Sequence, residues 1–256
     1  SQLTVTLRST QSRGAIIDAQ RLCRGMRIFG TNSVVEGFTI RNGVTNGGYG
    51  GGIYMIRPGT VRDCLVISNE AYGGAGICVY TSGALVEDCT VQSNLSTYFG
   101  GGVILYANST STLNRCLISG NVASNDGGGV VFQGAGIASN CWIADNRTIL
   151  YNAGGVEMQG GRLVNSVVVG NRAQMDGGGL YVSASGYVAN CTVVSNRAER
   201  EGGGLYGDLS SFWNNIVFYN TAPTNANVLK YNCVFSNNCA TTNFGGTNFT
   251  NAPTFV

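Results

Sequence analysis

Apolar and polar positions alternate along this chain in a pattern that starts again after each of a series of asparagines. In VANCTVVSNRAEREGGGLYG, apolar residues and a cysteine precede the asparagine, and a glycine triplet follows it. The arrangement returns at intervals of 24 to 27 residues, at Asn42, Asn69, Asn94, Asn121, Asn146, Asn171, Asn196 and Asn220. Self-similarity at such an interval is typical of a solenoid, in which one structural unit stacks on the next.

Three positions before the asparagine are apolar or small in nearly every unit. The position eight residues before it holds Val61, Val86, Leu113, Ala138, Leu163, Val188 and Phe212. The position five before it holds Cys64, Cys89, Cys116, Cys141, Ser166 and Cys191. The position three before it holds Val66, Val91, Ile118, Ile143, Val168, Val193 and Val217. The last two alternate with more variable positions, which predicts a strand with one face turned inward.

A glycine-rich triplet opens a second apolar segment in each unit, as in GGGIYMI, GAGICVY and GGGVVFQ. A leucine-rich repeat fits the spacing of the first segment, but it normally returns through a helix or a 3₁₀ turn. Glycines leading into β-branched and aromatic residues oppose a helix and favour a strand. We therefore expect two parallel strands per rung, in an all-β, single-domain right-handed parallel β-helix of about eight rungs.

The repeat also predicts the domain organisation. We expect one domain over residues 1–256, with an N-terminal rung or cap at 1–33, regular rungs at 34–220 and a C-terminal cap at 221–256. No composition shift or linker interrupts the repeat.

Composition narrows the functional classes. The 256 residues include 39 glycines, one lysine (Lys230) and no histidine, with a net charge of +2. This balance lacks the basic surface of a nucleic-acid-binding protein, and no apolar run is long enough to span a bilayer. The chain begins SQLTVTLRST, without methionine or a signal-peptide pattern, so we expect a mature or excised fragment.

The segments NCTVVSNRAEREGGGLY and DCTVQSN followed by GGGVILY resemble the right-handed β-helix repeats of bacterial surface and secreted proteins. They are most similar to the polymorphic outer-membrane repeats, which form autotransporter-like passengers. The resemblance covers roughly residues 34–220. It implies an exported protein at the bacterial cell surface or outside the cell, often with a role in adhesion. It implies no active site.

The cysteine and asparagine positions have structural interpretations. Cys64, Cys89, Cys116, Cys141 and Cys191 are expected to stack as small buried thiols. Asn69, Asn94, Asn121, Asn146, Asn171 and Asn196 are expected to tolerate the turn conformation and to pair in a ladder from rung to rung. Cys233 and Cys239 are candidates for a loop-closing disulfide in the C-terminal cap.

Two charged positions recur after the asparagine. One holds Arg147, Arg172 and Arg197, and the other holds Asp126, Asp176 and Glu201, with Tyr151 interrupting it. The simplest interpretation is surface pairing four residues apart, Arg172 with Asp176 and Arg197 with Glu201, which stabilises little. The alternative is a charged stripe that binds Ca²⁺ or an anionic glycan. No other cofactor is indicated.

Two outward positions of the glycine-led strand form a candidate binding face. One holds Tyr54, Cys78, Ile104, Val131, Glu157, Tyr181 and Tyr206; the next holds Ile56, Tyr80, Tyr106, Gln133, Gln159, Ser183 and Asp208. Together they predict a contiguous apolar and aromatic face over the N-terminal rungs, typical of a partner surface. Tyrosine rings at this spacing can stack on sugar rings. Self-association through the sheet faces or the open ends is a further expectation.

The leading functional hypothesis is a non-catalytic extracellular β-helix module of the adhesin or passenger type, binding a glycan or protein through its sheet faces. The alternative is a polysaccharide-active β-helix enzyme, either a lyase or a glycoside hydrolase. Such enzymes usually wall their cleft with long loops between rungs, whereas the intervals here vary only between 24 and 27 residues.

Overall fold

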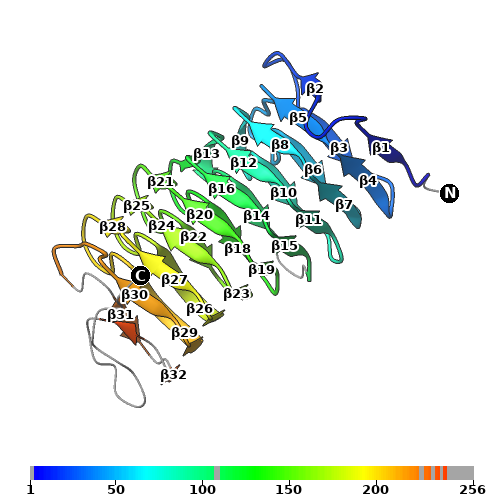
Figure 1. Cartoon of the computed structure of the whole chain (residues 1–256). Coiled ribbons are helices and arrows are strands. Elements are labelled where there is room, and N and C mark those ends of the chain that lie inside the picture. The colour runs from blue at the N-terminus through cyan, green and yellow to red at the C-terminus, as the bar shows by residue number, and fades with distance from the viewer. Residues whose placement is uncertain (1–2, 107–109, 225–227, 232–233, 237–238, 241–256) are drawn as a thin grey trace.

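The computed structural model describes residues 3–106, 110–224, 228–231, 234–236 and 239–240. In these residues every regular element is a β-strand, and the strands pair in parallel to form a solenoid of about eight turns. Figure 1 shows successive rungs stacked along one axis from β1 to β30. The described part of the chain contains no helix that could cross a membrane. The predicted all-β parallel solenoid is confirmed.

Each rung contributes two strands to the largest sheet. The glycine-led strands mostly follow a glycine-rich triplet, and β3 and β31 continue their column without one. They are β3 (Met26–Ile28), β6 (Ile53–Met55), β10 (Ile77–Val79), β14 (Val103–Leu105), β18 (Val130–Phe132), β22 (Val156–Met158), β26 (Leu180–Ala189), β29 (Leu205–Trp213) and β31 (Val228–Tyr231). The pre-cysteine strands come next; they are β1 (Thr6–Arg8), β4 (Ser33–Glu36), β7 (Gly59–Arg62), β11 (Leu85–Glu87), β15 (Thr112–Asn114), β19 (Ile137–Ser139), β23 (Arg162–Val164) and β32 (Val234–Ser236). Strands β26 and β29 run through both sets and join them into one sheet.

Two further sheets complete the rung. The post-cysteine strands are β2 (Ala15–Asp18), β5 (Phe38–Arg41), β8 (Leu65–Ile67), β12 (Thr90–Gln92), β16 (Leu117–Ser119), β20 (Trp142–Ala144), β24 (Val167–Val169), β27 (Thr192–Val194), β30 (Ile216–Phe218) and β33 (Cys239–Ala240). The post-asparagine strands are β9 (Glu70–Gly73), β13 (Leu95–Phe99), β17 (Val122–Ala123), β21 (Arg147–Thr148), β25 (Arg172–Ala173) and β28 (Arg197–Ala198).

Two strands per rung were predicted, but a regular rung contains more short strands than that. The reason is that the rung bends at more places than the hydrophobic pattern shows. Val61 and Val66 lie on separate strands, β7 and β8, with a left-handed residue, Asp63, between them. The post-asparagine strands are as short as two residues, and alternation over two residues cannot be recognised in a sequence. The predicted columns themselves are in register: Val61 pairs with Val86, and Val66 with Val91.

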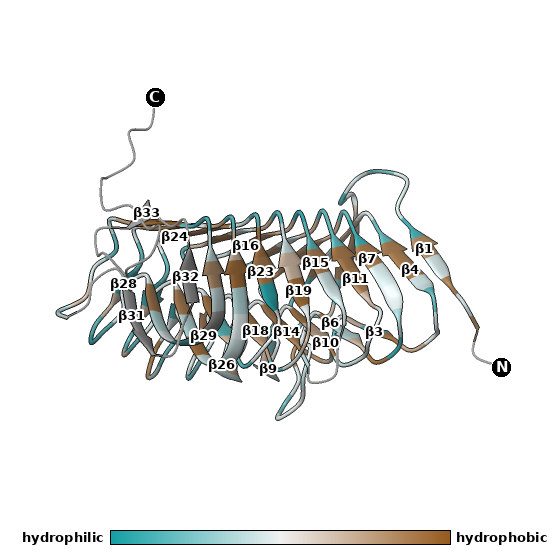
Figure 2. Cartoon of the chain, turned by 90° about the horizontal axis from the view of Figure 1, so that it is seen from below, coloured by the Kyte–Doolittle hydropathy of each residue, from teal (hydrophilic) through white to brown (hydrophobic). Residues whose placement is uncertain are grey.

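The inward columns form one continuous apolar core. Ile53, Val66 and Val86 are almost completely buried, like their counterparts on the other rungs. Figure 2 shows hydrophobic segments recurring on successive strands, with hydrophilic turns along the edge of the stack. Each rung therefore buries its apolar residues against the rungs on both sides, which is the main favourable contribution to folding.

The asparagines form a buried ladder along the whole stack. The Asn146 side chain accepts hydrogen bonds at Oδ1 from the backbone N and from Nδ2 of Asn121, both at 2.9 Å. Its own Nδ2 donates to Asn171 Oδ1 at 3.0 Å and to the Ile118 carbonyl at 2.9 Å. The same bonds recur from Asn69 to Asn220. The ladder satisfies polar groups of the turn that would otherwise be buried without a partner.

The turn conformation belongs to the residue before the ladder. Ser68, Ser93, Asp145 and Ser195 have φ values of 53–58°, whereas the ladder asparagines that follow them do not have positive φ. The interpretation that these asparagines supply the left-handed turn was therefore wrong; they supply the hydrogen bonds. Asn42 was expected in the ladder column, but it lies one residue before it. Its φ is 56°, like that of the residues before the ladder asparagines, and Gly43, whose N bonds Asn69 Oδ1, occupies the ladder position.

The glycines pass the chain closely beneath the next rung. A Cβ atom on Gly129 would lie 2.6 Å from the Gly155 carbonyl oxygen and 2.9 Å from Asn146 Nδ2. Neither atom can withdraw without breaking a rung-to-rung hydrogen bond, so only glycine fits between the ladder and the neighbouring backbone.

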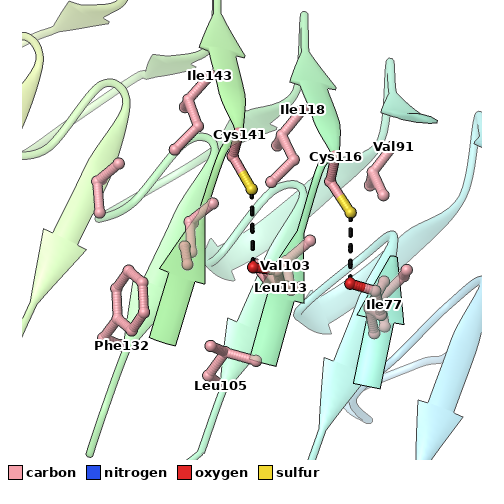
Figure 3. Close-up of a cluster of buried hydrophobic side chains, with 14 of the residues drawn as sticks. Ile77, Val91, Val103, Leu105, Leu113, Cys116, Ile118, Phe132, Cys141 and Ile143 are labelled. Atoms are coloured by element: carbon pink, nitrogen blue, oxygen red, sulfur yellow. Dashed lines mark hydrogen bonds between the residues drawn. The ribbon is translucent and has the colours of Figure 1, made fainter. Parts of the chain in front are cut away.

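The cysteine column is part of the core. Its members are buried free thiols, and the described residues contain no disulfide. Cys116 Sγ donates to the Val86 carbonyl at 3.6 Å, and Cys141 Sγ to the Leu113 carbonyl at 3.9 Å (Figure 3). Parallel in-register side chains point the same way, which prevents a disulfide bond between cysteines of neighbouring rungs. Cys233, the side chain of Cys239 and most of the expected cap at 221–256 lie outside the described residues.

Substituting Asn146 by alanine should lower the free energy of unfolding by about 3 kcal/mol, because it leaves two donors of Asn121 buried without an acceptor. The change is measured as a shift in the urea midpoint. The matched control is Asn125→Ala, at a half-buried side chain without a hydrogen bond to another described residue; its effect should stay within about 0.5 kcal/mol. Equal effects of the two substitutions would contradict a stabilising ladder.

A thiol reagent should label Cys23, which is exposed, in the native protein, and should label the buried thiols only after unfolding. Burial raises the pKa of Cys191 to about 12, so little reactive thiolate forms at neutral pH. Peptide mass spectrometry assigns the label to each cysteine, so that labelling of Cys233 and Cys239 is counted apart from that of the buried column. Rapid native labelling of Cys116 or Cys141 would contradict the buried column.

Candidate functional site

The outer face of the glycine-led strands carries the predicted aromatic column. Backbone pairing places its members in register from rung to rung, in the order Tyr54, Cys78, Ile104, Val131, Glu157, Tyr181 and Tyr206. None of them belongs to the core cluster, whereas their strand neighbours Ile53 and Met55 do. The column therefore lies on the side of the sheet that faces away from the core.

The middle of this face is covered rather than exposed to solvent. Ile104 and Val131 have no exposed surface, and the turn at the first glycine of their own triplets, Gly100 or Gly127, lies directly against them. A Cβ atom on Gly100 would lie within 2.3 Å of the Ile104 side chain, and one on Gly127 within 2.2 Å of that of Val131. The expectation of a contiguous apolar face was therefore wrong: covering turns divide the column into an N-terminal and a C-terminal site.

At the N-terminal site, Tyr54, Tyr80 and Tyr106 gather into what we call the N-terminal tyrosine patch. The ring centroids of Tyr54 and Tyr80 lie 6.2 Å apart, and those of Tyr80 and Tyr106 lie 4.8 Å apart. Tyr80 is 53% exposed. The Arg24 guanidinium lies 5.0 Å from the centroid of the Tyr54 ring. The patch thus presents aromatic surface beside a cation.

Further aromatic rings support the patch. Tyr49 packs edge-on against Tyr106 at 5.3 Å, and Tyr72 stacks in parallel on Tyr98 at 5.0 Å. Burial, followed by a hydrogen bond to Tyr49, raises the pKa of Tyr106. The Tyr106 hydroxyl therefore stays protonated. Sequence reasoning missed Tyr49, Tyr72 and Tyr98. Tyr72 and Tyr98 lie on the short strands β9 and β13, and Tyr49 forms an isolated bridge to Gly73; the packing of these segments on the face has no periodic signal.

At the C-terminal site, two stacked tyrosines follow a buried carboxyl group. The Tyr181 and Tyr206 rings are parallel within 5°, with centroids 5.3 Å apart. Glu157 pairs in register with Tyr181 and is 7% exposed. Burial raises the pKa of Glu157 to about 7, and the nearby Asp126 contributes to the rise, while a 2.9 Å hydrogen bond from Gln159 Nε2 opposes it. Sequence reasoning placed Glu157 in the column but assigned it no role.

The acidic column is rearranged relative to the prediction. Asn152, rather than Tyr151, stands between the rungs of Asp126 and Asp176, since its N bonds Asp126 Oδ1 and its Oδ1 accepts from Asp176 N. Asp176 continues the column to Glu201 through a backbone bridge. Asp176 is 1% exposed and forms an ion pair with Arg200, whose Nε lies 2.7 Å from Oδ1.

The arginine column is in register but pairs differently from the prediction. Arg147, Arg172 and Arg197 are exposed and stack on successive rungs. Arg172 and Arg197 both bind Glu199, at 2.7 and 2.9 Å, instead of Asp176 and Glu201. The predicted pairs were wrong because Glu199 lies two residues from Arg197 on the same turn and one rung, about 4.8 Å, from Arg172, and so takes both arginines.

The predicted calcium ligands do not gather into one site. Asp126, Asp176 and Glu201 lie on separate rungs, and Arg200 neutralises Asp176. The described residues contain no group of three or more carboxylates or thiols placed to hold a metal ion.

A groove of about 580 Å³ lies elsewhere, at the N-terminal end of the stack. It is lined by apolar residues of β1, β3 and β4 and of the segment before β1, among them Leu3, Val5 and Phe29. None of the predicted binding residues lines it. Association of two copies through this end stays a prediction.

The stacked strands, the buried ladder and the outward aromatic sites define a parallel β-solenoid with two candidate binding sites on one sheet. The chain belongs to the right-handed β-helix family: the model of a right handed beta helix region matches residues 24–198 and 75–254. No curated protein and no solved structure matches the chain. The comparisons therefore establish the fold family and assign no activity.

Replacing Glu157 by glutamine should remove a pH dependence of stability. The pKa of Glu157 is about 7 in the folded protein and about 4.5 in the unfolded chain, so the folded state binds more protons between these values. The free energy of unfolding should fall as pH rises from about 4.5 to about 7, by up to about 3 kcal/mol, and this fall should disappear in the variant. Urea midpoints at several pH values measure it.

The matched control for this experiment is Glu199→Gln. Hydrogen bonds from Arg197, followed by those from Arg172, lower the pKa of Glu199, so its stabilisation is lost only as pH falls below about 4.5. Between about pH 4.5 and 7 the control should therefore follow the unmodified protein. Parallel profiles of the unmodified protein and Glu157→Gln would contradict a protonated, buried Glu157.

Proposed function

We propose that this β-helix is a non-catalytic binding module that recognises glycans through the N-terminal tyrosine patch. The observation that carries the proposal is the set of three outward rings on successive rungs, with neighbouring centroids 4.8 and 6.2 Å apart. Each ring offers an apolar surface with a hydroxyl at its tip, which suits the alternating apolar and polar surfaces of a sugar.

The rigidity of the support favours binding. Tyr54 and Tyr80 belong to strands or strand ends whose backbone is hydrogen-bonded to both neighbouring rungs, and Tyr49 packs against Tyr106 from the side. Rings held in this way lose little conformational entropy when a ligand binds. A protein ligand on the same rings is the competing interpretation, and the glycan experiment below distinguishes the two.

The proposed location is the cell surface or the extracellular space, and the proposed role is that of an adhesin or passenger. Both rest on the resemblance of the NCTVVSNRAEREGGGLY type of repeat to bacterial surface proteins. The exposed arginine column of Arg147, Arg172 and Arg197 is proposed as a secondary contact for anionic ligand groups. Glu199 already neutralises two of these arginines, which weakens that contact.

A polysaccharide-active enzyme is the second candidate, and one observation favours it. Glu157 lies close enough to Asp126 for the two carboxyl groups to interact, and its pKa of about 7 suits a general acid. Against it, Arg200 neutralises the neighbouring Asp176, and the described groove at the N-terminal end contains neither Glu157 nor Asp126. Neither groove found among the described residues contains the carboxyl pair, whereas a glycosidase holds its substrate in a walled cleft.

Replacing Tyr54, Tyr80 and Tyr106 together by alanine should weaken binding to the glycans found on an array by about tenfold or more, since each lost stacking contact contributes roughly 0.5–1.5 kcal/mol. The control is Trp142→Ala, which removes a 51% exposed ring from the post-cysteine sheet and should leave binding unchanged. Isothermal titration calorimetry gives the affinities.

Two outcomes would overturn the proposal. If the triple variant binds every array glycan as tightly as the unmodified protein, the patch is not the site. If the protein releases reducing ends or unsaturated products from a bound polysaccharide, and Glu157→Gln stops the release, the enzyme is the correct reading.

A further inference from the structure

A step in the outward column defines a second site, which we call the Tyr181 step. On one rung the column holds the buried Glu157, and on the next it holds Tyr181, whose side chain is longer and more exposed. Tyr206 stacks on the other face of Tyr181, on the following rung. Because adjacent rungs are about 4.8 Å apart, the face of Tyr181 turned toward Glu157 lies beside the carboxyl group.

The Glu157 carboxyl group is only half satisfied by the protein. Oε1 accepts a 2.9 Å hydrogen bond from Gln159 Nε2, and Oε2 has no hydrogen-bond partner among the described residues. In the described structure the buried side-chain atoms without a partner are Arg62 Nε and Asp208 Oδ1. Glu157 Oε2 is not one of these fully buried atoms, so it keeps some contact with solvent. The residue as a whole is only 7% exposed.

The charges around the step are mostly negative. Burial, and then the charges of Asp176, Asp126 and Glu157, raise the pKa of Tyr181, while Arg200 opposes them. Arg200 is committed to Asp176. Asp126 Oδ1 accepts a hydrogen bond from the backbone N of Asn152. The step therefore combines an aromatic face, a free carboxyl oxygen and an excess of negative charge.

These properties together specify a ligand class. A sugar ring stacks on an aromatic face, and its hydroxyl groups donate to a carboxyl oxygen that lacks a partner. A ligand carboxylate or sulfate would meet the charges of Asp126 and Glu157 across a partly desolvated site, where repulsion is strong. An ammonium group would gain from the same charges, and it provides the competing arm of the test.

We propose that the Tyr181 step binds a neutral hexopyranose unit, with its ring against Tyr181 and a hydroxyl donating to Glu157 Oε2, and that it rejects uronates. The inference rests on the proposed glycan-binding function and names its ligand class at a different site from the N-terminal tyrosine patch. Because the two sites lie at opposite ends of the same face, one long chain of neutral sugars would contact both.

The experiment uses the intact chain and five hexamers of three kinds: neutral glucan, mannan and galactan hexamers, an anionic galacturonate hexamer and a cationic free-amine glucosamine hexamer. Calorimetry at pH 7.5 measures each affinity. We expect one or more neutral hexamers to bind, with Tyr181→Ala and Glu157→Leu each weakening binding about tenfold. Leucine matches the apolar neighbours of Glu157 in its column and keeps the fold, which is checked by the thermal midpoint.

Two conservative variants separate the ligand contacts from support of the fold. Tyr181→Phe retains the stacking face and should bind neutral hexamers within about twofold of the unmodified protein. Glu157→Gln retains a hydrogen-bonding oxygen but removes the charge, so it should hold neutral hexamers similarly and should bind the galacturonate hexamer more tightly than the unmodified protein does.

The proposal would be overturned if the galacturonate hexamer binds the unmodified protein and Tyr181→Ala abolishes that binding. It would also be overturned if the free-amine hexamer binds more tightly than every neutral hexamer. The failure of the proposal and of the proposed function can be told apart. If Tyr181→Ala and Glu157→Leu leave affinity unchanged while the triple tyrosine variant loses it, the step is not a site and the N-terminal patch stands. If no hexamer binds, both are overturned.

Discussion

The structure depends on one constraint, that each rung must present to the next the same hydrogen-bonding groups at the same place. The asparagine ladder enforces this constraint inside the stack. Each ladder side chain accepts from the asparagine of the preceding rung and donates to that of the following one, so a slip of one residue would leave several buried groups without partners. Apolar burial alone would not prevent such a slip, because several neighbouring positions are also apolar.

The same constraint explains why the proposed binding sites lie on the outer face. Inward positions are committed to the core, to the ladder or to the cysteine column, and the turns carry the left-handed residues that bend the rung. The outward positions are free to vary, and they do: tyrosines at one end, apolar residues under the covering turns, and then Glu157 before two tyrosines. A regular backbone thus holds an irregular set of side chains at fixed spacing.

The two outward sites differ chemically although they share one sheet. The N-terminal tyrosine patch is broad, aromatic and next to the guanidinium of Arg24, whereas the Tyr181 step is narrow and acidic. Covering turns separate them, because the chain at the first glycine of the triplet lies against Ile104 and Val131. A surface divided in this way favours a long, flexible ligand with repeating units over a compact one.

The sequence by itself determined the class of fold, the register of the inward apolar columns from Val61 onward and the identity of the inward residues, because stacking repeats each requirement at nearly constant spacing. The tertiary structure alone decided which outward residues are exposed and which charges pair. Arg200 reaches Asp176 across rungs, Glu199 binds two arginines, and turns bury Ile104 and Val131. These contacts depend on the path of each turn and on side-chain packing between rungs, and neither leaves a periodic trace in the sequence.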